Sequence, residues 1–329
     1  MKKIAKGIAY LLIIIVLIGI VAVSYITLAL PNVGPAEDIK VQITPQRIER
    51  GKYLALHVSA CLDCHSAHDW TKLGGPVDTT MLGSGGEVFD AGQGFPGKVI
   101  VPNITPFNLK SWTDGEIFRA ATTGVKKDGS PIFPLMPWKY YSKMDREDIY
   151  SIIAYLRTLK PIENTHPKAK LDFPLNILVH TMPQKATLGT KPAAADTIKY
   201  GEYLVQSAAC KDCHSQDNNG EILPGMEFAG GKEFKINGHS LKSANITPDA
   251  VTGIGNWTKQ QFIARFRVLN DVSKAPTINK ARDFQTLMPW WQYSKMTDGD
   301  LSSIYAYLKT VKPVSNTVIK FQLNSAPVN

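Results

Sequence analysis

The sequence predicts a mainly helical protein in which one domain occurs twice in tandem behind an N-terminal membrane helix. Three observations lead to this prediction. A long apolar stretch without charges lies near the N-terminus, and a series of short motifs then occurs twice in the same order. Within each copy, apolar residues follow the spacing of a helix. The length of 329 residues accommodates two domains of ordinary size.

The apolar stretch, residues 7–30, contains no charged side chain and is preceded by lysines. At about 1.5 Å rise per residue it would span roughly 36 Å, enough to cross the hydrocarbon core of a bilayer. The lysines should stay in the cytoplasm, so the remainder would be exported. The alternative is a cleaved signal peptide, but its apolar core is usually about 7–15 residues long, and residues 28–31 make a poor cleavage site. We therefore expect a transmembrane anchor over residues 1–30 and a tether over 31–45.

The repeat defines the rest of the chain. Its paired motifs start at Gly51 and Gly201, Cys61 and Cys210, Asn103 and Asn245, Trp112 and Trp257, Leu135 and Leu287, Tyr141 and Tyr293, and Ala154 and Ala306. Such self-similarity is the mark of a duplicated domain. We predict domains over residues 46–162 and 197–315, joined by a linker over 163–196 that packs on the surface and followed by a tail over 316–329.

Each copy is predicted to consist of helices joined by loops. A first helix leads into the cysteine motif, over residues 51–58 and again over 201–208. A middle helix starts after Thr113 and after Thr258, because each threonine is followed three residues later by a Glu or Gln that completes a capping box. A last helix closes each copy near a Lys-Pro pair. The connecting loops are rich in Gly and Pro and show little strand signal.

Both copies contain the pattern C-x-x-C-H, which attaches haem c, since the two thiols bond to the vinyl groups and the histidine reaches the iron. The sequence therefore predicts two covalently bound haem c groups. Their attachment residues are Cys61, Cys64, Cys210 and Cys213, and their histidine ligands are His65 and His214. A thioredoxin-like dithiol would need a preceding strand, and a shared zinc site would need the two pairs closer in sequence.

The second axial ligand of each iron should occur in both copies. Met136 and Met288 do so, in the motif Leu-Met-Pro-Trp, and a methionine ligand closes the iron and raises its reduction potential. Met144 and Met296 also recur, but they precede helix starts, where a hydrophobic staple explains them. We therefore predict Met136 and Met288 as the ligands.

Other recurring residues are candidates for the haem pockets. Asn103 and Asn245 could donate a hydrogen bond to a haem propionate, and a role in a turn is the alternative. Trp138 and Trp290 could form pocket walls, and core packing is the alternative. His68 does not recur, but it lies close to the first cysteine motif.

The formal charge of +9 indicates no particular partner, because the basic residues are scattered and form no long run. We expect a solvated surface and no binding to nucleic acid.

With these residues, each copy resembles a class I cytochrome c domain, which has a first helix entering C-x-x-C-H, a Met-Pro loop and a closing helix with Ala-Tyr-Leu. In that family the first and last helices cross near a glycine and an aromatic residue, here Gly51 with Tyr155 and Gly201 with Tyr307. More narrowly, the recurring NITP, Trp-Thr, LMP and AYL motifs resemble those of the cytochrome c subunits of membrane-bound alcohol, aldehyde and gluconate dehydrogenases. Those subunits commonly have three such domains, whereas this chain has two.

The resemblance implies an electron-transfer protein and not an enzyme. It implies a membrane-anchored dihaem cytochrome c that relays electrons from a dehydrogenase or quinol-oxidising complex to a terminal acceptor, such as an oxidase or a small cytochrome. The lysine-flanked apolar segment predicts a single-pass protein of the bacterial cytoplasmic membrane with its haem domains on the periplasmic side.

Two enzymes are the alternatives. A dihaem cytochrome c peroxidase-type enzyme needs one iron that can open a coordination position, whereas an equivalent methionine occurs in both copies. A thiolate-ligated dihaem enzyme of sulfur oxidation needs a spare cysteine, and all 4 cysteines belong to the two motifs.

Overall fold

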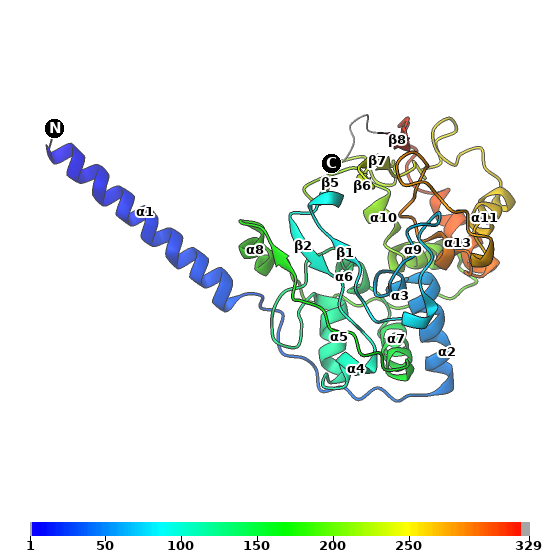
Figure 1. Cartoon of the computed structure of the whole chain (residues 1–329), viewed down its shortest axis with the longest axis horizontal. Coiled ribbons are helices and arrows are strands. Elements are labelled where there is room, and N and C mark those ends of the chain that lie inside the picture. The colour runs from blue at the N-terminus through cyan, green and yellow to red at the C-terminus, as the bar shows by residue number, and fades with distance from the viewer. Residues whose placement is uncertain (1, 324–329) are drawn as a thin grey trace.

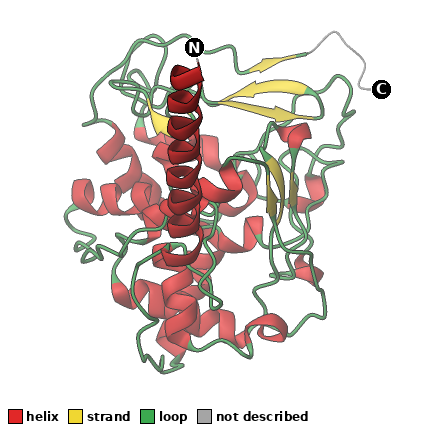
Figure 2. Cartoon of the chain, turned by 90° about the vertical axis from the view of Figure 1, so that its left-hand side faces the viewer, coloured by secondary structure: helices red, strands yellow, loops and turns green. Residues whose placement is uncertain are grey.

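The computed structural model describes residues 2–323 and is mainly helical. Helix α1 (Lys2–Ala29) projects from the folded body and makes few contacts with it (Figure 1). Among the described residues it is the one helix long and apolar enough to cross a membrane, and none of its residues is buried. Figure 2 shows the body behind this helix, with small sheets set among short helices and long loops.

Two helix pairs form the framework of the body. Helix α2 (Pro45–Tyr53) continues as a π-helix, η1 (Leu54–Val58), and packs on α7 (Arg146–Thr158). Helix α9 (Thr197–Ser207) packs in the same way on α13 (Asp298–Leu308). The first and last helices of each predicted copy are therefore in contact.

Glycine permits the close approach of each pair. A Cβ atom on Gly51 would lie 1.8 Å from the Ser151 carbonyl oxygen, and one on Gly201 would lie 1.9 Å from that of Ser303. These distances are far below van der Waals contact, so any larger residue would force the helices apart.

The π-helix absorbs a difference in length between the two copies. The first copy has one residue more between Leu54 and Cys61 than the second has between Leu204 and Cys210. A π-turn accommodates one extra residue within a helix without changing the direction of the flanking turns. Both cysteine motifs therefore follow their first helices in the same manner.

The other helices of the described chain have between 4 and 10 residues. They are α3 (Cys61–Cys64), α4 (Pro106–Leu109), α5 (Asp114–Thr123), α6 (Trp138–Tyr141), α8 (Leu175–Leu178), α10 (Cys210–Cys213), α11 (Lys259–Arg267) and α12 (Trp290–Tyr293), with 3-10 turns η2 (Thr79–Met81), η3 (Ala91–Gln93), η4 (Val179–Thr181) and η5 (Val272–Lys274). The predicted capping boxes at Thr113 and Thr258 are confirmed, at the starts of α5 and α11.

Within residues 2–323, three small antiparallel sheets also occur, which the sequence did not predict. Their orders are β1-β2-β3, β4-β5 and β6-β7-β8. The strands are β1 (Val88–Phe89), β2 (Gly97–Ile100), β3 (Lys170–Leu171), β4 (Asp217–Asn218), β5 (Glu221–Ile222), β6 (Glu233–Ile236), β7 (His239–Lys242) and β8 (Phe321–Gln322). Strands of two to four residues are too short to show an alternating pattern, which explains the miss. Residues 324–329 of the predicted tail lie outside the described residues.

The segment predicted as a linker packs on the body. Strand β3 pairs with β2, while α8 and the adjoining η4 contact α1. These elements of the segment therefore contact other parts of the chain.

The two halves of the body exchange equivalent hydrogen bonds. The Tyr53 hydroxyl donates to Asp300 Oδ2 at 2.6 Å, and the Tyr203 hydroxyl donates to Asp148 Oδ2 at 2.7 Å. Tyr53 and Tyr203 occupy matching positions of the repeat, as do Asp148 and Asp300. Each half thus contributes the same donor and the same acceptor.

A second reciprocal pair lies on the same helices. His57 Nδ1 is 3.2 Å from the Gln292 carbonyl oxygen, and Gln206 Nε2 donates to the Tyr140 carbonyl at 2.9 Å. His57 and Gln206 occupy matching positions, and so do Gln292 and Tyr140. The halves therefore face one another with approximate twofold symmetry.

Candidate functional site

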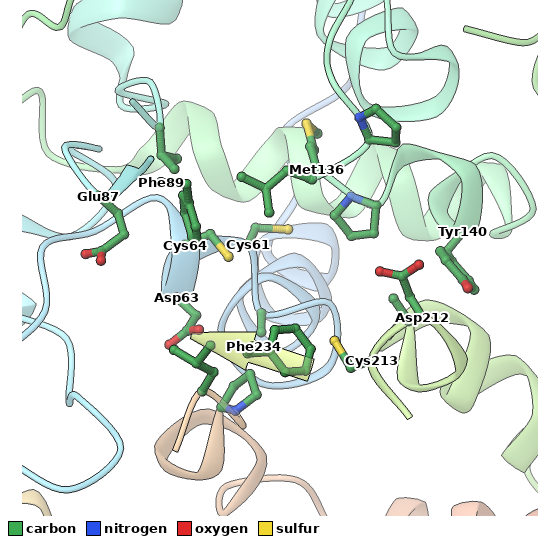
Figure 3. A pocket seen from close by; sticks show the side chains of 18 of the residues that line it. Cys61, Asp63, Cys64, Glu87, Phe89, Met136, Tyr140, Asp212, Cys213 and Phe234 are labelled. Atoms are coloured by element: carbon green, nitrogen blue, oxygen red, sulfur yellow. The ribbon is translucent and has the colours of Figure 1, made fainter. Parts of the chain in front are cut away.

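A continuous cavity of about 3510 Å³ is lined by residues of both halves, including all four cysteines. Figure 3 shows Cys61, Cys64 and Met136 beside this cavity together with Asp212 and Cys213 of the second motif. Burial raises the pKa of the Cys64 thiol, and the nearby Cys213 thiol contributes to this rise. The two motifs therefore belong to adjoining sites and not to separate surfaces.

An unusual backbone turn introduces each motif. Ala60 and Ala209, which immediately precede the first cysteines, have φ values of 47° and 50°. A left-handed conformation costs a residue with a side chain about 1 kcal/mol or more. Its occurrence at the same place in both halves indicates that this turn aims the cysteines into the cavity.

Two buried tyrosines brace these turns. The Tyr141 hydroxyl donates to the Ser59 carbonyl at 2.9 Å, and the Tyr293 hydroxyl donates to the Ala208 carbonyl at 3.2 Å. Burial raises the pKa of both phenols well above the ordinary value, so both remain neutral donors. The sequence did not predict this role, although the recurrence of Tyr141 and Tyr293 in the repeat could have indicated it.

Each motif histidine lines the cavity and uses one ring nitrogen in a hydrogen bond to the backbone. His65 Nδ1 lies 2.8 Å from the Pro102 carbonyl oxygen, and His214 Nδ1 lies 2.8 Å from that of Ala244. A carbonyl oxygen can only accept a hydrogen bond, so Nδ1 carries the proton and donates it in both rings, and the lone pair is on Nε2. Burial lowers the pKa of both imidazoles, which keeps them neutral and able to coordinate a metal.

The recurring asparagines hold these accepting carbonyls in place. Asn103 donates to the carbonyls of Ile162 and Asn164 at 2.8 and 3.0 Å, and its oxygen accepts from the Thr105 amide. Both amide hydrogens are therefore engaged, and the structure favours the turn role over a bond to a propionate. Pro102, whose carbonyl accepts from His65, immediately precedes this turn.

Asn245 behaves in the same way. It donates to Thr252 Oγ1 at 2.9 Å and to the Val314 carbonyl at 2.7 Å, and it accepts from the Thr247 amide. Ala244, whose carbonyl faces His214, immediately precedes it.

The candidate methionine ligands line the cavity. Met136 and Met288 are both in the cavity wall, on loops that lead into α6 and α12. Met144 and Met296, the other recurring pair, are buried in the hydrophobic core, at 0% and 2% exposure. The two pairs therefore differ in their surroundings, and the role of Met136 and Met288 as ligands stays a prediction.

The two recurring tryptophans differ. Trp290 lines the cavity, with the Arg265 guanidinium 4.3 Å from its ring centroid. Trp138 lies behind the wall, where its ring packs on Gly124 and its Nε1 donates to the Ile132 carbonyl. In place of Gly124 the second half has Leu269, which packs against Trp290 and occupies this space. Trp290 therefore lines the cavity, so its role in a haem pocket stays a prediction, whereas Trp138 packs in the core, which was the alternative interpretation.

His68 takes part in a polar cluster beside the first motif. Its Nδ1 is 2.9 Å from Glu87 Oε2 and its Nε2 is 3.3 Å from Asp63 Oδ1, while Trp70 stacks on the ring. Burial alone would lower the pKa of His68, but the bonds and charges of the two carboxylates outweigh it and raise the pKa to about 9. A buried imidazolium between two carboxylates therefore borders the cavity.

The matching positions of the second half hold a related cluster. Lys232 Nζ lies 2.8 Å from Asp217 Oδ2 and 3.9 Å from Asp212 Oδ2. Lys232 matches Glu87, and Asp217 matches His68. One cation and two carboxylates thus occur in both clusters, with the cation at a different position in each.

The donor set fits haem c. Each half directs two thiols, a neutral imidazole nitrogen and a thioether at one cavity, which is the set that covalent attachment and axial ligation require. Burial raises the pKa of the Cys61 and Cys210 thiols to about 12, so thiolate chemistry at neutral pH is disfavoured.

Comparison with known proteins finds cytochromes among the relatives of this chain. The cytochrome c subunit of the quinone alcohol dehydrogenase of Gluconacetobacter polyoxogenes is 25% identical over 283 residues, covering 81% of this chain and 56% of the relative. The fructose dehydrogenase cytochrome subunit of Gluconobacter japonicus is 27% identical over 297 residues, covering 84% and 55%. A diheme cytochrome c-type protein of Cereibacter sphaeroides is 24% identical over 264 residues, covering 77% and 82%.

The homologues are therefore cytochrome c subunits of dehydrogenases and a diheme cytochrome c, at modest identity over most of the chain. By name the dehydrogenase relatives are the cytochrome subunits of their complexes. The chain spans little more than half the length of the dehydrogenase subunits it matches. No protein-family model matches the chain.

Proposed function

We propose that this chain is a membrane-anchored dihaem cytochrome c that relays electrons from a dehydrogenase or quinol-oxidising complex to a terminal acceptor. One observation carries the proposal: each half directs two thiols, a neutral imidazole and a thioether into the same cavity. The homology to cytochrome c subunits supports it independently. The two halves, residues 46–162 and 197–315, are then tandem class I cytochrome c domains.

The residues of each half would serve two purposes, the covalent attachment of haem c and the ligation of its iron. Haem c, when bound, stores one electron by the change of its iron between the ferric and ferrous states. Cys61, Cys64, Cys210 and Cys213 would hold the two groups covalently, with His65 and Met136 as axial ligands in the first half and His214 and Met288 in the second. Trp290 would form part of the second pocket wall.

The chain's own structure serves transfer in two ways. The backbone carbonyls of Pro102 and Ala244 fix the two imidazoles, so little rearrangement accompanies a change of charge at the metal. The continuous cavity is lined by residues of both halves, which would favour transfer between the two groups. Helix α1 would cross the bacterial cytoplasmic membrane once and keep the haem domains on the periplasmic side.

The proposal is tested on the full chain purified from membranes in detergent. A haemochrome assay should find two haem c groups per chain, and Cys61→Ala with Cys64→Ala, or Cys210→Ala with Cys213→Ala, should each leave one. Retention of both groups in either double variant would contradict the assignment.

Carbon monoxide distinguishes the carrier from the peroxidase-type enzyme. Two irons closed by methionine should bind little carbon monoxide in the native reduced protein. Extensive binding without denaturant would favour the enzyme instead. The donor and acceptor would be found by affinity capture from membranes and staining of the gel for haem.

A further inference from the structure

We propose that residues 170–182, here called the strap, form a second membrane contact by inserting apolar side chains into the lipid interface beside α1. This inference rests on the proposed function, because it takes α1 to be the membrane helix. It adds a surface on the folded body that lipid would cover.

The strap lies where the membrane helix ends. Its helix α8 and the adjoining turn η4 both contact α1 (Figure 1). His180 Nδ1 also lies 3.1 Å from the Leu30 carbonyl oxygen, immediately beyond the end of α1. The strap is therefore joined to the segment that leaves the bilayer.

The length of α1 sets the depth of this junction. Its 28 residues would extend about 42 Å, which is longer than a hydrocarbon core of about 30 Å and close to the thickness with headgroups included. If the lysine-rich start reaches the cytoplasmic headgroups, the other end reaches the opposite headgroup layer. Side chains in contact with this end lie at the level of the lipid interface.

The outer side of the strap is apolar at this level. Phe173 is 78% exposed and Leu178 is 45% exposed, and both belong to the strap that contacts α1. Transfer of one such side chain out of water contributes about 1.5–3 kcal/mol. Two lysines beside it, Lys168 and Lys170, are exposed and suit anionic headgroups, although Asp172 between Lys170 and Phe173 is exposed as well.

The inner side of the strap faces the first site. Leu175, Val179 and Met182 line the cavity that holds Cys61 and Cys64. One short segment thus has lipid on one side and the first haem site on the other. The strap would hold the first half at a fixed orientation to the membrane, which a helix on a tether alone would not do.

Spin-label accessibility tests this on the full chain, loaded with haem, in vesicles of phosphatidylethanolamine and phosphatidylglycerol. The native cysteines are consumed by haem attachment, so an introduced cysteine is the reactive thiol. Phe173→Cys and, as a second position, Leu178→Cys report the strap. Ile15→Cys reports the middle of α1, and Val268→Cys, 64% exposed at the end of α11 on the far side of the body from α1, is the aqueous control (Figure 1).

Collision with oxygen, which concentrates in lipid, is compared with collision with a water-soluble nickel chelate. We expect labels at 173 and 178 to favour oxygen several-fold relative to the label at 268, and to be shallower than the label at 15. Labels at 173 and 178 that match the label at 268, while the label at 15 is in lipid, would overturn the strap contact alone. An aqueous label at 15 would overturn the membrane anchor and the strap contact with it.

Discussion

His68 and its two carboxylates show how single residues differ between otherwise matching sites. Both halves place one cation and two carboxylates beside the second cysteine, but the first half uses an imidazolium and the second an ammonium. Lys232 remains charged across the physiological pH range, whereas His68 loses its proton at a lower pH than Lys232, near its pKa of about 9. The electrostatic environment of the first site should therefore depend on pH more than that of the second.

Replacement of His68 by Gln should remove a pH dependence of stability. The pKa of His68 is raised to about 9 in the folded chain from an ordinary 6.5, so the folded state binds the proton more tightly. The resulting stabilisation is present in full below pH 6.5 and disappears as the pH rises to about 9; at about 1.4 kcal/mol per pKa unit it amounts to about 3 kcal/mol.

The measurement is the free energy of unfolding in denaturant between pH 6 and 9.5 in detergent, for the native chain and His68→Gln. The difference between them should shrink as the pH rises. A constant difference would show that His68 is neutral in the folded protein. Lys232→Gln serves as the matched variant, because the pKa of Lys232 is raised above an already high value and its loss should show little pH dependence below pH 9.

The two candidate methionines should be separable by spectroscopy. Met136→Leu and Met288→Leu each retain volume but remove the thioether, so each should lose about half of the charge-transfer absorption of ferric His/Met haem. The affected haem should also fall in reduction potential by a substantial part of the about 0.8 V that axial ligands control. Met144→Leu is the control, because Met144 is buried in the core and should leave the band intact. Survival of the full band in both ligand variants would contradict the assignment.

At the scale of elements, the crossing of the first and last helices is the most constrained feature. Gly51→Ala and Gly201→Ala would each drive a Cβ into a backbone carbonyl of the partner helix, at 1.8 and 1.9 Å. The helices cannot separate without disturbing the cavity, so we expect each change to cost about 2–4 kcal/mol of unfolding free energy.

The control for this prediction lies in α13. A Cβ on Gly299 would meet only Thr297 Oγ1, at 3.8 Å, so Gly299→Ala should be neutral or stabilising by up to about 1 kcal/mol. Equal losses in all three variants would contradict the role of crowding at the helix crossing, because helix propensity favours Ala over Gly at each of these positions.

Motifs with a fixed spacing could be recognised in the sequence, whereas features that depend on contacts between distant segments could not be predicted from it. The haem motifs, the methionine pair and the capping boxes are local patterns whose chemistry allows few alternatives. The pairing of β3 with β2 was missed because the two strands are short and lie far apart in the chain. Trp138 and Trp290 looked equivalent, but the exchange of Gly124 for Leu269 changed the space available to each ring.

At the scale of the whole molecule, the contact between the halves is the clearest example of a feature that the sequence did not predict. Tyr53 and Tyr203 lie in the most regular part of the repeat, and nothing in their spacing shows that each crosses to the other half. A duplicated domain that packs on its own copy can use one surface twice, so a single pair of complementary residues becomes two contacts. Such symmetry also holds both cysteine motifs beside one cavity.

The two contacts should differ in strength because their acceptors differ. Asp148 is also bound by Arg50 at 2.7 Å and Lys191 at 3.4 Å, whereas among residues 2–323 no ion pair includes Asp300. Tyr203→Phe therefore leaves a carboxylate that keeps other partners. Tyr53→Phe leaves Asp300 largely buried without its phenol, so its cost should approach the about 1.5–3 kcal/mol of a charged hydrogen bond and exceed that of Tyr203→Phe.

The double variant should uncouple the halves. We expect the native chain to unfold in one transition and Tyr53→Phe with Tyr203→Phe to unfold in two, when absorption of the haems is followed together with far-ultraviolet circular dichroism. Tyr305→Phe is the matched control, because Tyr305 donates to the Trp257 carbonyl within the second half and its loss should lower stability without separating the transitions. A single transition in the double variant would mean that the apolar contacts between the halves suffice. The reciprocal tyrosines would then set the geometry of the interface but not its cohesion.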